Sequence, residues 1–161
     1  MATSSASKSN VVPIKVAEKK ESEKKWGTAV MNVGYCILPS ILLRAQARLL
    51  INAQQMNVLL QLIEHWWTAD GKVYPSKDTI AGRVGLSTKQ VQRHIKVLEE
   101  KGLVRRIPRV LKTQGKTSNE YDLSGLVKKL KAIEPDFRQA KKLQKAAASP
   151  GGLKAAQAAN K

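Results

Sequence analysis

The segment 76–102 constrains the fold more than any other part of the chain. A serine that can cap a helix precedes residues 77–84, which have the spacing of a short helix. Gly85 follows, at the position after a helix where the backbone often adopts a left-handed conformation, which favours glycine. Ser87 can then cap a longer helix over residues 88–101. Two helices joined by a short turn with glycine are typical of a helix-turn-helix.

The longer helix has two contrasting faces. Val91, Ile95 and Leu98 recur at helical spacing and form one narrow apolar stripe. Ala81, on the short helix, is small enough to let the two helices cross closely, and Leu86 points inward from the turn. We therefore expect the apolar stripe to be buried and the opposite, basic and amide-rich face to point outward.

A β-hairpin is expected directly after the second helix. Residues 103–107 and 110–111 predict a basic strand. Pro108 indicates an edge strand or a bulge, because proline has no backbone N–H to donate. Residues 119–123 predict a returning strand with Tyr121 and Leu123 pointing inward. A hairpin in this position is a wing. The predicted fold is therefore mainly α with a small β-hairpin wing, a winged helix-turn-helix.

The chain before this motif supplies the rest of the expected scaffold. Residues 28–38 predict an extended lead-in, and Pro39-Ser40 opens a helix whose apolar positions are Ile41, Leu42, Ala45, Leu49 and Leu50. Asn52 can cap the next helix, over residues 53–67.

The segment after the wing continues this scaffold. Ser124 is expected to cap a helix, and Pro135 to end or kink it. Leu126, Leu130, Ile133, Phe137 and Ala140 form a stripe along it, and packing of the first half of this stripe on the core is favoured over a coiled coil.

Charge indicates the kind of partner. The 161 residues contain 29 lysines and arginines against 12 acids, a net charge of +17. Such an excess points to a polyanion, and it is concentrated after residue 68. Residues 1–25 predict a disordered basic tail, residues 26–133 the folded domain, and residues 134–161 a helix that passes into a disordered tail rich in lysine and alanine.

Composition also excludes several classes of protein. Cys36 is the single cysteine, and His65 and His94 are the two histidines, so no disulfide framework or metal motif is expected. We expect a binding protein without cofactor or metal, not an enzyme. No apolar run is long enough to span a bilayer, so a cytoplasmic location is expected.

The run YPSKDTIAGRVGLSTKQVQRHIKVLEEKGLVRRIPRV, followed by SNEYDLSGLVKKL, resembles the winged helix-turn-helix domain of phage and plasmid replication proteins and related transcriptional regulators. With the helical lead-in, the resemblance covers about residues 36–132. It implies double-stranded DNA as the partner, with the helix over 88–101 in the major groove. It also implies a place in the bacterial nucleoid, or in a plasmid or phage context.

The predicted DNA contacts fall in two groups. On the longer helix, Gln90 and Arg93 are expected to read bases, because their side chains can pair bidentately with adenine and guanine. Other residues are expected to meet the phosphate backbone. The full set on the helix is Ser87, Thr88, Lys89, Gln90, Gln92, Arg93 and Lys96. In the wing it is Arg105, Arg106, Arg109, Lys112 and Lys116.

Two other functions stay open at this point. A non-specific nucleic-acid-packing protein would rely on the basic C-terminal segment, and an interaction subunit of a larger nucleoprotein assembly would use the fold for docking. A homodimer is also open, since one recognition helix reads few bases.

Overall fold

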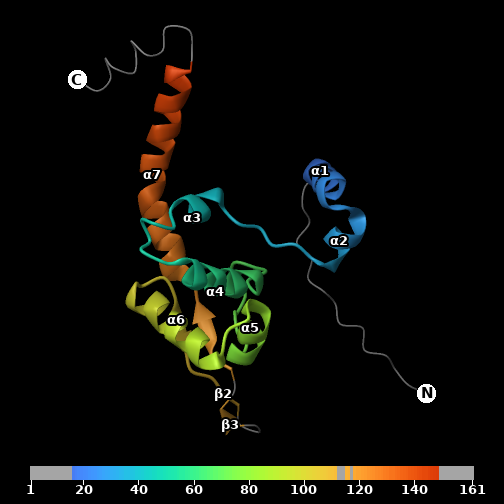
Figure 1. Cartoon of the computed structure of the whole chain (residues 1–161), viewed down its shortest axis with the longest axis vertical. Coiled ribbons are helices and arrows are strands. Elements are labelled where there is room, and N and C mark those ends of the chain that lie inside the picture. The colour runs from blue at the N-terminus through green and yellow to red at the C-terminus, as the bar shows by residue number, and fades with distance from the viewer. Residues whose placement is uncertain (1–15, 112–114, 117, 149–161) are drawn as a thin grey trace.

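The structure, a computed structural model, describes residues 16–111, 115–116 and 118–148 (Figure 1). The expected tails at 1–15 and 149–161 lie outside the described residues. The helices are α1 (Val16–Trp26), α2 (Thr28–Val33), α3 (Ser40–Arg44), α4 (Ala53–Glu64), α5 (Lys77–Val84), α6 (Thr88–Glu100) and α7 (Ser124–Ala147). The strands are β1 (Arg105–Ile107), β2 (Val110–Leu111), β3 (Gly115–Lys116) and β4 (Glu120–Asp122).

Helices α5 and α6 form the predicted pair, with the predicted caps. The Ser76 hydroxyl accepts a hydrogen bond from the Thr79 amide at 3.0 Å. Gly85 adopts the left-handed conformation, with φ of 68° and ψ of 34°. The Ser87 hydroxyl accepts a hydrogen bond from the Gln90 amide at 3.2 Å. Local sequence therefore sets both the end of α5 and the start of α6.

The core forms where α4, α5 and α6 pack together. From α6, Val91, Ile95 and Leu98 are completely buried, which confirms the predicted stripe. Helix α4 contributes Met56, Val58, Leu59, Leu62 and Ile63. Tyr121 is the one aromatic side chain in the buried cluster of the described residues, so the core is almost entirely aliphatic. None of the polar or charged side chains in the described part is buried.

The hairpin follows α6, as expected. Strand β1 pairs antiparallel with β4, and β2 pairs antiparallel with β3, with Pro108 and Arg109 between β1 and β2. Tyr121 also forms an isolated bridge with Val73, which ties the hairpin to the segment before α5. Tyr121 and Leu123 are buried, as predicted. The structure is mainly helical with a small β-hairpin, which confirms the predicted fold class.

Helix α7 returns onto the body through an unusually close contact. The Leu126 amide donates to the Leu103 carbonyl at 3.0 Å. A Cβ atom at Gly125 would lie 2.3 Å from the Gly102 carbonyl oxygen. Gly102 itself has φ of 63°, in the left-handed region. Two glycines therefore let the start of α7 lie directly against the turn between α6 and β1.

The sequence predictions for the start and course of α7 need correction. Ser124 does not cap the helix; instead the Asp122 carboxylate accepts a hydrogen bond from the Ser124 amide at 2.8 Å. Pro135 does not end the helix, which continues to Ala147 across the predicted domain boundary at 133/134. Proline removes one backbone donor, but Ile133 and Phe137 pack on the core on either side of it and hold the helix together.

The N-terminal part also differs from the predictions. Helix α1 lies almost entirely in the segment 1–25, which the sequence predicts to be disordered. Its lysines, glutamates and alanine favour a helix even without a core. The expected extended lead-in instead contains α2, none of whose residues is buried.

The helix predicted from Pro39-Ser40 is short. Helix α3 ends at Arg44, and turns replace the rest of the predicted helix up to Leu50. Leu50 has φ of 56° and is 74% exposed, whereas Ile51 is buried. The chain reverses here to enter α4, so the last predicted apolar position of this helix faces solvent. The following helix is capped by Asn52, as predicted, but ends at Glu64.

The close contact of Gly125 gives a testable prediction. Gly125→Ala should lower the free energy of unfolding by about 1–3 kcal/mol, because backbone must move to admit the new methyl group. Urea unfolding measures this change. Gly82→Ala in α5 is the matched control, because a Cβ atom there meets nothing within 4 Å. It should leave stability unchanged or raise it by up to about 1 kcal/mol, and equal effects of the two substitutions would contradict the prediction.

Candidate nucleic-acid interface

The outward face of α6 carries cations without acidic partners in its first two turns. Lys89, Gln90, Gln92, Arg93 and Lys96 are exposed, and Thr88 is half-buried. Among the described residues, neither Lys89 nor Arg93 forms an ion pair, whereas Lys96 lies 3.7 Å from the carboxylate of Glu100. Lys89 and Arg93 are four residues apart and therefore neighbours on one face. This face combines free positive charge with the positive end of the helix dipole.

Gln90 is part of the N-terminal cap of α6. Its side-chain oxygen accepts hydrogen bonds from the Ser87 amide and the Ser87 hydroxyl, both at 2.9 Å. Ser87 and Gln90 therefore form a reciprocal capping box. Base reading by Gln90 stays a prediction, and bidentate pairing with adenine would require its oxygen to leave the cap.

One flank of α6 binds neighbouring cations through two of its side chains. The Lys77 ammonium of α5 donates to the Gln92 side-chain oxygen at 3.2 Å. Seven residues further, and so on the same flank, the Glu99 carboxylate pairs with Arg106 of β1 at 2.5 Å and accepts from the Arg106 amide at 2.9 Å. These contacts hold α5 and the hairpin against α6. Lys77 was not predicted as a site residue, although the sequence places it directly after the helix cap Ser76.

Two arginines of the wing form ion pairs that brace the hairpin. Arg106 is 30% exposed and bound to Glu99, so it links β1 to α6. Arg105 is 74% exposed, but its guanidinium donates twice to one Asp122 oxygen, at 2.8 and 3.2 Å. Both guanidinium groups brace the hairpin in the structure, and the expected DNA contacts of Arg105 and Arg106 stay a prediction. Asp122 lies opposite Arg105 in the strand register, whereas Glu99 reaches Arg106 from the end of α6.

Tyr74 is a residue of this surface that sequence reasoning missed. The Arg109 guanidinium stacks over its ring, 4.6 Å from the centroid. The Tyr74 carbonyl accepts a hydrogen bond from the Ser118 hydroxyl at 3.0 Å, so Tyr74 contacts both sides of the hairpin. Tyr74 is 52% exposed. The sequence feature that could have pointed to Tyr74 is its position directly before the Pro-Ser start of a helix.

The predicted contacts at the tip of the wing are not described. Lys112 lies outside the described residues, and for Lys116 the structure gives the backbone of β3 and not the side chain. Their assignment as DNA contacts stays a prediction.

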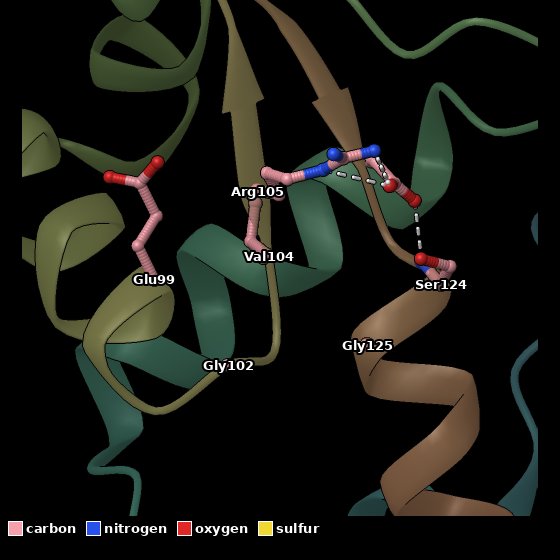
Figure 2. Close-up of a pocket in the computed structure, with 7 residues that line it drawn as sticks. Glu99, Gly102, Val104, Arg105, Ser124 and Gly125 are labelled. Carbon is pink, nitrogen blue, oxygen red and sulfur yellow. Dashed lines mark hydrogen bonds and ion pairs between the residues drawn. The ribbon is translucent and has the colours of Figure 1, made fainter.

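A hollow of about 430 Å³ lies between the end of α6, β1 and the start of α7. Figure 2 shows the ion pair of Arg105 with Asp122 and the contact of Asp122 with Ser124 along one side of it. Glu99 lies on the opposite side and pairs with Arg106. Each charged group that lines the hollow therefore forms an ion pair, Arg105 with Asp122 and Glu99 with Arg106.

The ion pairs and hydrogen bonds around this hollow lower the pKa values of two acidic residues, Glu99 and Asp122. Burial alone would raise the pKa of Glu99, but hydrogen bonds from Arg106 and its positive charge outweigh burial and lower it. Hydrogen bonds from Ser124, followed by those from Arg105, lower the pKa of Asp122. Both carboxylates are therefore stabilised in the charged form in the folded protein.

The described residues offer no arrangement typical of nucleophilic or metal chemistry. Partial burial and the nearby charge of Glu64 raise the pKa of the Cys36 thiol, which is the reverse of what an activated thiolate needs. No group of three or more potential ligands occurs within the described ranges. In the same part of the chain, no helix has the length and apolar character needed to cross a bilayer.

Comparison with known proteins supports the motif. Residues 49–104 match the family model of a helix-turn-helix domain. This range ends just after α6. The matched range includes α4, α5 and α6, in agreement with the helix-turn-helix fold. No curated protein is similar to the sequence.

Two solved structures resemble the fold. A possible transcriptional regulator from Methanosarcina mazei Go1 has 20% identity and a TM-score of 0.39, covering 62% of this chain and 82% of that one. A MarR family transcription regulator has 14% identity and a TM-score of 0.39, covering 89% and 86% respectively. The resemblance to phage and plasmid replication proteins is not confirmed by these comparisons.

The Glu99–Arg106 pair predicts a pH dependence of stability. Because the pKa of Glu99 is lower in the folded than in the unfolded chain, stability should fall as pH drops below the usual glutamate value of about 4.3. Glu99→Gln should make this acid-side loss shallower, as measured by urea unfolding across the acid range. Arg106→Gln should have the same effect, because it removes the cause of the shift. An acid slope that neither substitution changes would contradict this account.

The Tyr74–Arg109 stack predicts a local effect on the hairpin. Tyr74→Leu should release Arg109 and cost about 0.5–1 kcal/mol of stability, since an exposed cation–π contact has this strength. Nuclear magnetic relaxation of the Arg109 Nε–H group should report faster motion. Tyr74→Phe keeps an aromatic face and is the matched control, so unchanged relaxation in Tyr74→Leu would show that the stack does not hold Arg109.

Proposed function

We propose that this chain is a double-stranded DNA-binding regulator that places α6 in the major groove. The observation that carries the proposal is the pair Lys89 and Arg93 on the outer face of α6. These cations have no ion-pair partner among the described residues, and the inner face of the same helix is completely buried at Val91 and Ile95. The helix cannot rotate without exposing its core side, so these two cations are held outward.

The roles along α6 follow from distance to its N-terminus. In a helix-turn-helix, the N-terminal residues of the second helix meet base edges while neighbouring groups meet phosphates. We assign Arg93 to base reading, because a guanidinium matches the two acceptors of guanine. We assign Thr88 and Lys89 to the phosphate backbone, where a hydroxyl, an ammonium and the helix dipole all favour an anion. Gln92 and Lys96 lie at the flanks, where backbone contact is expected.

The hairpin is proposed to bind the backbone or minor groove beside α6. Arg109 is the described cation best prepared for this, because Tyr74 orients it without neutralising it. Lys112 and Lys116 extend the same hairpin by their place in the sequence. Arg105 and Arg106 act at the base of the wing, where they keep it in position.

The proposed process follows from the sequence resemblance. Resemblance of residues 74–110 and 118–130 to replication proteins of phages and plasmids suggests regulation or replication of a mobile element, in the cytoplasm of a bacterium. A homodimer would let two copies of α6 read neighbouring half-sites. No enzymatic step is part of this function.

Substitution of Arg93 tests the proposal. Duplexes are first selected from a random pool with the full chain, and affinity is then measured by fluorescence anisotropy. Arg93→Ala should weaken binding by about 1–3 kcal/mol and relax the preference at one base pair. Arg44→Ala is the matched control, because Arg44 is an exposed arginine at the end of α3, outside the proposed interface.

Salt dependence adds a second measurement on the same duplexes. If about six phosphates are neutralised, the plot of log affinity against log salt should have a slope of about −5. Arg93→Ala with wild-type affinity and wild-type base preference would show that α6 is not the reading element.

A further inference from the structure

Helix α7 has a packed half and a projecting half. Leu126 and Leu130 are buried, and Ile133 and Phe137 pack against the core. The Arg48 guanidinium marks the end of the packed half: it pairs with Asp136 at 2.6 Å and lies 5.7 Å from the centre of the Phe137 ring. Beyond Phe137 the helix continues for about 15 Å, at 1.5 Å per residue. Figure 1 shows this part standing clear of the body.

The projecting half is strongly basic on one side. Arg138, Lys142 and Lys145 follow one another at intervals of one helix turn, and Lys131 lies seven residues before Arg138 on the same side. All four are exposed. Glu134 pairs with Arg138 at 3.2 Å. Among the described residues, none of the three lysines forms an ion pair, and no acidic residue lies between Asp136 and the end of α7.

Such a surface is unfavourable without a partner. Like charges three or four residues apart destabilise a helix by a few tenths of a kcal/mol per pair. No packing offsets that repulsion here, because the side chains beyond Phe137 are largely exposed. A polyanion lying along the helix would relieve it and would release counterions.

The apolar side of this half favours nucleic acid over a lipid surface. Helices that lie in a membrane interface insert large residues such as tryptophan, phenylalanine and leucine. Here the projecting half offers Leu143 as its one large apolar residue, beside Ala140 and Ala147. That surface is too small to anchor a helix in lipid, whereas phosphate binding requires the cations alone.

The position of this surface separates it from α6 and the wing. Figure 1 shows the β2–β3 hairpin at one end of the long axis and the tip of α7 at the other. Lys145 lies about 30 Å along α7 from Ser124, where the helix leaves the hairpin. A duplex held by α6 and the wing therefore runs clear of Lys142 and Lys145.

We propose that the basic side of α7, formed by Lys131, Arg138, Lys142 and Lys145, binds the phosphate backbone of a second nucleic-acid segment, so that one chain bridges two duplexes. This inference rests on the proposed function for the first duplex. It assigns the second contact to α7 itself, with no sequence preference, because lysines on a helix face can track a backbone without reading bases.

The test is a capture experiment with the full chain. A selected duplex is immobilised and saturated with protein, and retention of a second, fluorescent duplex of unrelated sequence is then measured. Lys142→Gln combined with Lys145→Gln should reduce retention about tenfold, because two phosphate contacts are lost. Binding to the immobilised duplex should stay at the wild-type level. Lys128→Gln with Lys129→Gln is the matched control, since these exposed lysines lie in the packed half of α7.

The outcomes are distinguishable. If the wild-type chain does not bind the immobilised duplex, the proposed function fails. If it binds the immobilised duplex but captures no second duplex, α7 is not the bridge. The same conclusion follows if the Lys142/Lys145 variant and the Lys128/Lys129 control change capture equally. Bridging through α6 of a second copy would survive the α7 substitutions and would also overturn the inference. Sedimentation with phosphatidylserine–phosphatidylcholine vesicles that depends on Lys142 and Lys145, without duplex capture, would replace nucleic acid by lipid.

Discussion

Burial of the inner face of α6 is the constraint on which the rest of the structure depends. Val91, Ile95 and Leu98 are completely buried against α4 and α5, which fixes the rotation of α6 about its axis. That rotation determines that Lys89 and Arg93 face outward. Just after α6, Gly102 in the left-handed conformation turns the chain into the hairpin. A polar substitution in the stripe would disturb the core and the proposed interface together.

The cationic side chains of this protein fall into two groups, those paired with a carboxylate and those without such a partner. Cations near a carboxylate become braces: Arg106 holds β1 to α6 through Glu99, and Arg105 holds β1 to β4 through Asp122. Cations without such a neighbour among the described residues, such as Lys89 and Arg93 of α6 and Lys142 and Lys145 of α7, remain available for an external anion. Net charge alone therefore overestimates how many cations are free to bind phosphate. What matters is which cations the fold leaves without a carboxylate, since those keep their full attraction for phosphate.

Much of the fold and part of the site could be predicted from local sequence. The caps at Ser76 and Ser87 and the left-handed Gly85 depend on their immediate neighbours, and a reader of the sequence sees those neighbours. The sequence predicted helix on both sides of Pro135 but not whether the helix ends there, because packing of Ile133 and Phe137 on a distant core offsets the lost hydrogen bond. The Tyr74–Arg109 stack was also invisible, since its partners lie 35 positions apart and meet only through the hairpin.

The sequence by itself determined the helix-turn-helix, the hairpin after it and the apolar stripe of α6. These follow from backbone conformational preference and helical periodicity, which act over a few residues. Tertiary structure alone decided which carboxylates pair with the arginines of the wing. It also decided that α7 extends as one helix beyond the core. Those outcomes depend on strand register and on the Gly102–Gly125 contact, which join residues distant in the chain.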